Sequence, residues 1–223
     1  MKRFLFLIVA ISFMNSCKES SDDVAIGSYI SPHFISAYLV PTKIEVLSNA
    51  PGHLYLSATG EVYKTSANKG SANYDKVQYF SNLYGDTSYN RASQSFNNAL
   101  AYPIDKITIY CEKDFDDKHS AGEPLDDIVK LDYQSYYDYV KSGYTSYKDN
   151  PDYIDKTVDH YVLSFNSITA DISKLMVVSL ASPTSFAGVK FDSAPAESGE
   201  YTFTLEMTTN GETLKTEFTH TFE

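Results

Sequence analysis

The C-terminal end carries the pattern that most constrains the fold of this chain. Residues 200–208 and 213–222 alternate polar and apolar side chains, and Asn210-Gly211 stands between the two runs. Alternation with a period of two is typical of strands that bury one face. Asn and Gly accept the positive φ angles of a tight two-residue hairpin turn. The sequence therefore predicts that the chain ends in a β-hairpin.

This turn also determines which residues of the hairpin face each other. The predicted pairs are Met207–Leu214, Leu205–Thr216 and Phe203–Phe218 on one face and Glu206–Lys215 on the other. The apolar positions coincide on one face and an opposite-charge pair forms on the other, as expected for a stable pair of strands. The side chains expected to be buried are Tyr201, Phe203, Leu205, Met207, Leu214 and Phe218.

Shorter strand patterns recur along the rest of the chain, with turn residues between them. They lie at 43–47, 53–57, 61–64, 77–80, 106–112, 161–165, 175–180 and 186–192. Many short strands separated by turns favour a mainly β fold, and we expect an antiparallel β-sandwich, immunoglobulin-like or related. Residues 91–101 have a partial helical stripe, and residues 132–148 fit either a helix or an ordered loop. The expected fold therefore includes one or two short helices or long loops.

Residues 1–16 have the pattern of a secretory signal. Basic residues are followed by an apolar core that runs from Phe4 through Met14. This core is shorter than the ~20 residues that a membrane-spanning helix needs. The alternatives are a cytoplasmic N-terminal strand or a membrane anchor. We divide the chain into a signal at 1–16, a linker at 17–27 and a single β-rich domain at 28–223.

The signal ends in Met14-Asn15-Ser16-Cys17, which resembles the lipobox of bacterial lipoproteins. The acidic stretch that follows, residues 18–23, resembles the export tag of surface lipoproteins in Bacteroidota. The resemblance implies that the chain is cut before Cys17 and that the Cys17 thiol carries diacylglycerol. With an added N-acyl chain, this would give a stable membrane anchor. It thus implies an outer-membrane lipoprotein with a lipidated, acidic linker at 17–27, at the cell surface or facing the periplasm.

The body of the chain is also similar to small Bacteroidota surface lipoproteins of unknown function. The similarity rests on the strand and acidic residues at 107–117, the turn at 121–127 and the closing hairpin. That group has no agreed activity, so the resemblance implies no particular reaction or ligand.

The net charge narrows the classes of partner that this chain can bind. The chain has 18 Lys and Arg against 29 Asp and Glu, a formal charge of −11 that becomes −13 without residues 1–16. This balance argues against nucleic acid as a partner, because phosphate binding needs clustered basic residues.

Cys17 and Cys111 are the two cysteines. Cys111 lies on the apolar face of a predicted strand, so we expect a buried thiol rather than a nucleophile; a Cys17–Cys111 disulfide in an unlipidated protein is the alternative.

Tyrosines crowd one segment of a chain that has 19 Tyr and no Trp. The cluster consists of Tyr133, Tyr136, Tyr137, Tyr139, Tyr144, Tyr147 and Tyr153. Tyrosine offers a rigid apolar ring with a polar tip, which suits recognition of a protein or a glycan. The same rings could instead pack in the core, and the sequence leaves both interpretations open.

An acidic run supplies the candidate metal ligands Asp114, Asp116 and Asp117. Carboxylates at this density suit calcium, but Lys118 and His119 stand where an EF-hand loop needs a ligand and a glycine. The alternative is a solvated loop. Farther along, Asp192-Ser193-Ala194 is similar to the acceptor motif for O-glycosylation of exported Bacteroidota proteins, with Ser193 as the acceptor.

The sequence shows no established catalytic motif. The five histidines are scattered, and the Ser66-x-x-Lys69 pattern lacks the partner motifs of its enzyme class. We therefore expect a non-enzymatic binding or adhesion lipoprotein without a cofactor, whose partners are the membrane and a protein or glycan ligand. The alternative is a calcium-dependent or hydrolytic glycan-processing accessory protein that uses the loop at 114–127.

Overall fold

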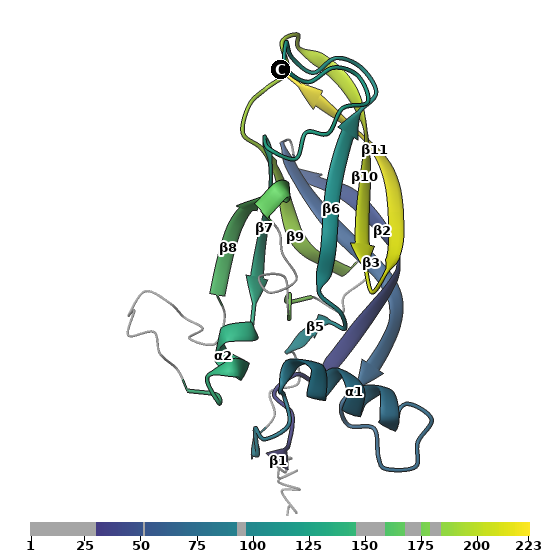
Figure 1. Cartoon of the computed structure of the whole chain (residues 1–223), viewed down its shortest axis with the longest axis vertical. Helices are drawn as coiled ribbons and strands as arrows, with labels where there is room; N and C mark the ends of the chain where they lie inside the picture. Colours follow the sequence, from purple (N-terminus) through teal and green to yellow (C-terminus); the bar gives the residue numbers. More distant parts are fainter. Residues whose placement is uncertain (1–29, 51, 93–96, 146–158, 168–174, 179–183) are drawn as a thin grey trace, which may run out of the picture.

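The fold is mainly β, as the sequence predicts: of the described residues, 53% lie in strands and 12% in helices. The structure is a computed structural model that describes residues 30–50, 52–92, 97–145, 159–167, 175–178 and 184–223. The molecule is elongated (Figure 1). The first described strand, β1, lies at one end, and the C-terminus lies at the other.

Two larger sheets form the sandwich-like body. The six-stranded sheet has the order β5 (Asn98–Leu100), β2 (Ala37–Ala50), β3 (His53–Lys64), β9 (Thr184–Phe191), β7 (Val129–Ser135), β8 (Asp159–Ser164). Within it, only β5 and β2 pair in parallel among the described strands. The three-stranded sheet has the order β11 (Glu212–Phe222), β10 (Gly199–Thr209), β6 (Ile104–Cys111). A separate ribbon pairs β1 (Ile30–Ser31) with β4 (Arg91–Ala92).

The predicted C-terminal hairpin is confirmed. Asn210 and Gly211 have φ values of 51° and 76°, as a tight two-residue turn requires. Strands β10 and β11 pair in the predicted register, so Phe203 faces Phe218, and Lys215 Nζ lies 2.7 Å from Glu206 Oε1. Tyr201, Phe203, Leu205 and Met207 are buried, and Leu214 and Phe218 are partly buried against the core.

The long hairpin of β2 and β3 bends at one glycine. A Cβ atom at Gly60 would lie 1.9 Å from the carbonyl oxygen of Val40, a distance that no side chain tolerates. The register shifts beside it, between Pro41 and Lys43, which marks a β-bulge. The hairpin contributes side chains to two separate apolar clusters, Leu39 and Ile44 to one and Tyr38 and Tyr63 to the other.

The first cluster, the sandwich core, lies between the two larger sheets. Its largest fully buried members are Phe203, Phe115, Leu39, Ile44, Leu56, Leu100, Ile104, Ile107 and Tyr133. Cys111 belongs to it and is only 1% exposed, which confirms the predicted buried thiol, and burial raises the pKa of this thiol.

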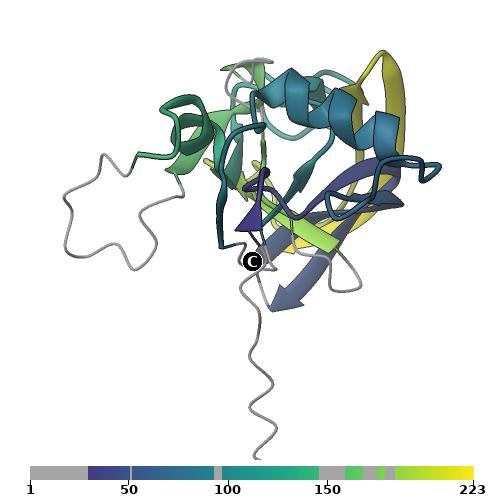
Figure 2. The ribbon, with the colours of Figure 1, turned by 90° about the horizontal axis from the view of Figure 1, so that it is seen from below.

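The second cluster, the tyrosine core, lies at the end of the molecule that carries β1. Helices α1 (Tyr74–Tyr84) and α2 (Tyr137–Lys141) supply much of it, and Figure 2 shows α1 lying across this end. Its tyrosines are Tyr38, Tyr63, Tyr84, Tyr136, Tyr139 and Tyr144. They pack mostly edge to face, for example Phe34 with Tyr136 at 5.1 Å between ring centroids.

A buried carboxylate holds the tyrosine core together, and we call its contacts the Asp86 clasp. The Asp86 carboxylate accepts hydrogen bonds from the backbone N–H groups of Phe34 (2.7 Å) and Ile35 (2.9 Å). The hydroxyls of Tyr144 (3.0 Å) and Tyr38 (3.3 Å) also donate to it. Burial raises the pKa of Asp86, and these hydrogen bonds oppose the rise. The clasp ties the first described segment to the end of α1.

Three sequence predictions about local structure are wrong. Residues 77–80 were expected to be a strand but belong to α1, since Val77, Phe80 and Tyr84 form its buried stripe. Residues 91–101 were expected to be partly helical but contain β4 and β5. The described part of 175–180 makes only isolated bridges instead of a strand. Residues 132–148 were left open between helix and loop, and the described part divides between β7 and the five-residue α2.

Candidate binding groove

The outer face of the six-stranded sheet carries a polar patch at its centre. Along β7, Leu131 and Tyr133 point into the sandwich core, whereas Lys130, Asp132 and Gln134 point the other way. This is the alternation expected of a strand with one buried face. The outward side chains are therefore placed by the same pattern that builds the core.

Strand register brings residues from four strands to the level of Asp132. Asp132 pairs with Val162 of β8 on one side and with Gly188 of β9 on the other. Gly188 in turn pairs with Tyr55 of β3. Directly paired residues share a face of the sheet, so Tyr55, Gly188 and Asp132 form one row across the outer face.

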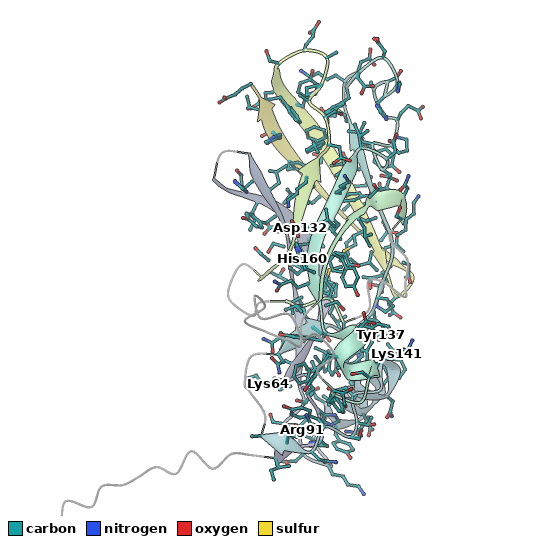
Figure 3. The ribbon with its side chains drawn as sticks, turned by 90° about the vertical axis from the view of Figure 1, so that its left-hand side faces the viewer. Lys64, Arg91, Asp132, Tyr137, Lys141 and His160 are labelled. Carbon is teal, nitrogen blue, oxygen red and sulfur yellow. The ribbon has the colours of Figure 1, made fainter. Side chains whose placement is uncertain are left out.

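Asp132 lies at the centre of an ion-pair cluster. Its Oδ1 accepts a hydrogen bond from His160 Nε2, and its Oδ2 accepts one from Lys190 Nζ. Figure 3 shows Asp132 and His160 side by side at mid-height of the molecule. The Asp132 side chain is 17% exposed, against 46% for His160 and 56% for Lys190. Burial alone would raise the pKa of Asp132, but its hydrogen bonds to Lys190 and His160 outweigh burial and lower it.

Gly188 leaves the centre of the row without a side chain. A Cβ atom there would have its nearest neighbours at 3.4 Å (Asp132 Cβ), 3.7 Å (Asp132 O) and 3.9 Å (Leu54 O), which are ordinary contacts. Neither crowding nor a positive φ angle therefore requires glycine at this position. A glycine inside a strand costs stability, and it often marks a place that a ligand approaches closely.

These residues line an open groove with a volume of about 960 Å³. Volumes of ~300–1,000 Å³ are typical of small-molecule sites. Besides the row and its ion pairs, the lining includes His53, Gln134, Ser185, Phe186, Phe191, Asp192, Ser193, His220 and Phe222. Phe186 belongs to the sandwich core, and Phe191 and Phe222 pack against it. On the outer face, Tyr55 supplies the aromatic ring, beside hydrogen-bonding side chains.

The charges in the groove are balanced. The charged lining residues are Asp132, Lys190 and Asp192. Asp132 and Lys190 pair with each other, and Asp192 Oδ2 lies 2.8 Å from Lys130 Nζ. Burial lowers the pKa of His220, so this histidine is neutral near pH 7.

The structure places the predicted tyrosine surface mostly in the core. Tyr133 is buried in the sandwich core, and Tyr136, Tyr139 and Tyr144 are buried in the tyrosine core, each at most 6% exposed. Of the two interpretations that the sequence leaves open, core packing describes these four rings. Tyr137 is half-buried and receives a hydrogen bond from Lys141 Nζ, and Figure 3 shows the two together. Tyr147 and Tyr153 lie outside the described residues.

The acidic run at 114–127 bonds to its own loop. His119 lies between two carboxylates, with Nδ1 2.7 Å from Asp116 Oδ1 and Nε2 3.1 Å from Asp127 Oδ1. Asp114 Oδ1 accepts a hydrogen bond from the backbone N–H of Ala121. Among the described residues, no three His, Cys, Asp or Glu side chains are grouped to hold a metal. Of the two interpretations of Asp114, Asp116 and Asp117, these contacts favour the solvated loop over the calcium site.

Of the two predicted modification sites, Ser193 lies within the described residues and Cys17 does not. Ser193 is exposed on the loop after β9, at the rim of the groove, as a modified serine would have to be. Cys17 and the whole signal and linker lie outside the described residues.

The groove residues were missed by the sequence analysis because they come from distant strands. His160 is 28 positions and Lys190 is 58 positions from Asp132. The one local signal was Gly188, an isolated glycine within the predicted strand at 186–192.

In comparisons with known proteins, no family model, no curated protein and no solved structure matches this chain. Within the part of the chain that the structure describes, no helix has the length and apolar character to cross a membrane.

Proposed function

We propose that this chain is a lipid-anchored, extracytoplasmic binding protein, without catalytic activity, that holds its ligand in the groove over Gly188. The groove is the observation that supports the proposal. On an outer sheet face, Gly188 lies between Tyr55 and the Asp132 ion pairs, although neither crowding nor a positive φ angle requires glycine there. The anchor is supported by the signal and lipobox pattern, in which Cys17 would carry the lipid at the outer membrane. Surface exposure is supported by the acidic stretch at 18–23.

The binding part of the proposal has a direct test. The mature protein would be screened by thermal shift against a library of polar small molecules, oligosaccharides and peptides, since a ligand that binds only the folded state raises the melting temperature. We expect at least one compound to stabilise the wild-type protein and to lose this effect in Gly188→Val. Stabilisation that is equal in both proteins would rule out the groove as the binding site.

The anchoring part is tested in cells. An alkyne-tagged fatty acid should label the wild-type chain and leave Cys17→Ala unlabelled. Protease added to intact cells should then remove the labelled protein if it faces outward. Labelling that persists in Cys17→Ala would contradict the proposed anchor.

A further inference from the structure

The balanced charges of the groove restrict the charge of its ligand. An anionic ligand would have to displace Asp132 from Lys190 or Asp192 from Lys130, and a cationic one would have to displace the lysines. Such a displacement costs most at Asp132, whose side chain is only 17% exposed and would be left without its partner. An anion would also approach a body whose formal charge is −13 after loss of residues 1–16. The groove therefore favours a neutral ligand.

The polar groups of the groove favour a ligand that carries neighbouring hydroxyls. The Asp132 carboxylate only accepts hydrogen bonds, and the Lys190 ammonium, which has three N–H donors, lies directly beside it. Two adjacent hydroxyls can donate to the first and accept from the second, in bonds strengthened by the charges. Gln134 and Ser185 add neutral donors and acceptors along the wall.

The shape of the row favours a ring with one apolar face. Tyr55 and Asp132 lie on the strands that flank β9, which places them roughly 9–10 Å apart by ordinary strand spacing. Gly188 between them adds no side chain. A flat ring fits in this gap with its C–H groups against the aromatic ring.

We infer that the groove binds a neutral sugar residue, seated over Gly188 between Tyr55 and the Asp132–Lys190 pair. The inference rests on the proposed function, since it names the ligand class of the same groove. The C–H face of the sugar contacts Tyr55, and two of its hydroxyls bond to Asp132 and Lys190.

The test is a printed array of neutral, sialylated and sulfated glycans together with acidic and basic peptides. The mature wild-type protein in detergent would be compared with Gly188→Val, Gly188→Ala and Asp132→Asn, and Thr219→Val on an exposed position of β11 is the matched control. We expect the wild-type and control proteins to bind neutral glycans with equal affinity. Gly188→Val should bind about 100-fold more weakly, and Asp132→Asn about 10- to 100-fold more weakly.

The outcomes test the ligand class and the position of the binding site separately. If only charged glycans or peptides bind, and Gly188→Val abolishes that binding, the sugar inference falls while the groove remains the binding site. If neutral glycans bind equally to Gly188→Val, both proposals about the groove fall. If no neutral glycan binds the wild-type protein, the inference is overturned. Melting curves check folding, and Gly188→Ala, which adds a single carbon, serves if Gly188→Val fails to fold.

Discussion

The two apolar clusters of this molecule are built from different kinds of side chain. The sandwich core is built mainly from aliphatic residues and phenylalanines held between two sheets. The tyrosine core fills the end of the molecule with six tyrosines around short helices and irregular segments. Each buried tyrosine brings a hydroxyl that needs a partner. The comparison shows why the second cluster contains a buried carboxylate: Asp86 accepts hydrogen bonds from two of those hydroxyls and from two backbone N–H groups.

The largest expected effect comes from the sandwich core. Phe203 is fully buried and lies 5.1 Å from Phe191 and 5.2 Å from Phe218, ring centroid to centroid. Phe203→Ala should lower the free energy of unfolding by about 3–5 kcal/mol, since it removes a whole ring from a packed site. Urea denaturation measures this loss. Thr204→Ala, which points away from the core, is the control, and equal effects of the two substitutions would contradict the assignment.

Removal of the Asp86 clasp should cause the second-largest loss in the free energy of unfolding. Asp86→Ala leaves the donors on Phe34, Ile35 and Tyr144 buried without an acceptor, which should cost about 3 kcal/mol. Asp86→Asn keeps one acceptor oxygen and should cost less. Hydrogen exchange should show faster exchange of the Phe34 and Ile35 amides while the amide of Leu205 stays protected. Uniform loss of protection across the molecule would mean that the two cores unfold as one unit.

A single hydroxyl tests the polar part of the tyrosine core. Tyr144→Phe keeps the buried ring but removes one donor to Asp86, so the free energy of unfolding should fall by about 1–2 kcal/mol. Tyr137→Phe is the matched control, because the Tyr137 ring is only half-buried and its hydroxyl contacts an exposed lysine. A Tyr144→Phe protein as stable as the wild type would show that packing alone maintains this cluster.

The smallest effect concerns the loop that covers the far end of the sandwich core. Burial tends to lower the pKa of His119, but Asp116 and Asp127 outweigh burial and raise it. Because the folded state holds this proton more tightly, the stabilisation is complete below about pH 6.5 and is lost as pH rises through the folded pKa. His119→Gln should therefore melt lower than wild type at pH 5.5, by no more than about 2–4 °C. The difference should shrink at pH 8.5, and a constant gap would argue against a protonated His119.

Sequence reasoning succeeded where the information was local. The hairpin of β10 and β11 was predicted with its register because Asn210-Gly211 and the alternation on both sides lie within one short segment. Cys111 was predicted to be buried for the same reason. Helix α1 was not predicted because residues 77–80 include a β-branched and two aromatic side chains, which favour a strand in so short a run, whereas the spacing of Val77, Phe80 and Tyr84 is helical.

The parts that failed depend on contacts between distant residues. Strand β5 forms because residues 98–100 pair with residues 37–39 of β2. No local sequence pattern predicts this pairing. Tyr136, Tyr139 and Tyr144 are buried because α1 and the segment around Phe34 cover them. The Asp132 cluster needs three strands in register before it exists.

The Asp86 clasp also determines how this molecule would respond to mechanical force. A pull on the chain ahead of Ile30 meets first the two-residue pairing of β1 with β4, and then the hydrogen bonds from Phe34 and Ile35 to Asp86. Those bonds pass the load to the end of α1, to Tyr144 and, through the Tyr38 hydroxyl, to β2 of the six-stranded sheet. The tyrosine core would therefore yield before the sandwich core, and the groove over Gly188 would keep its shape.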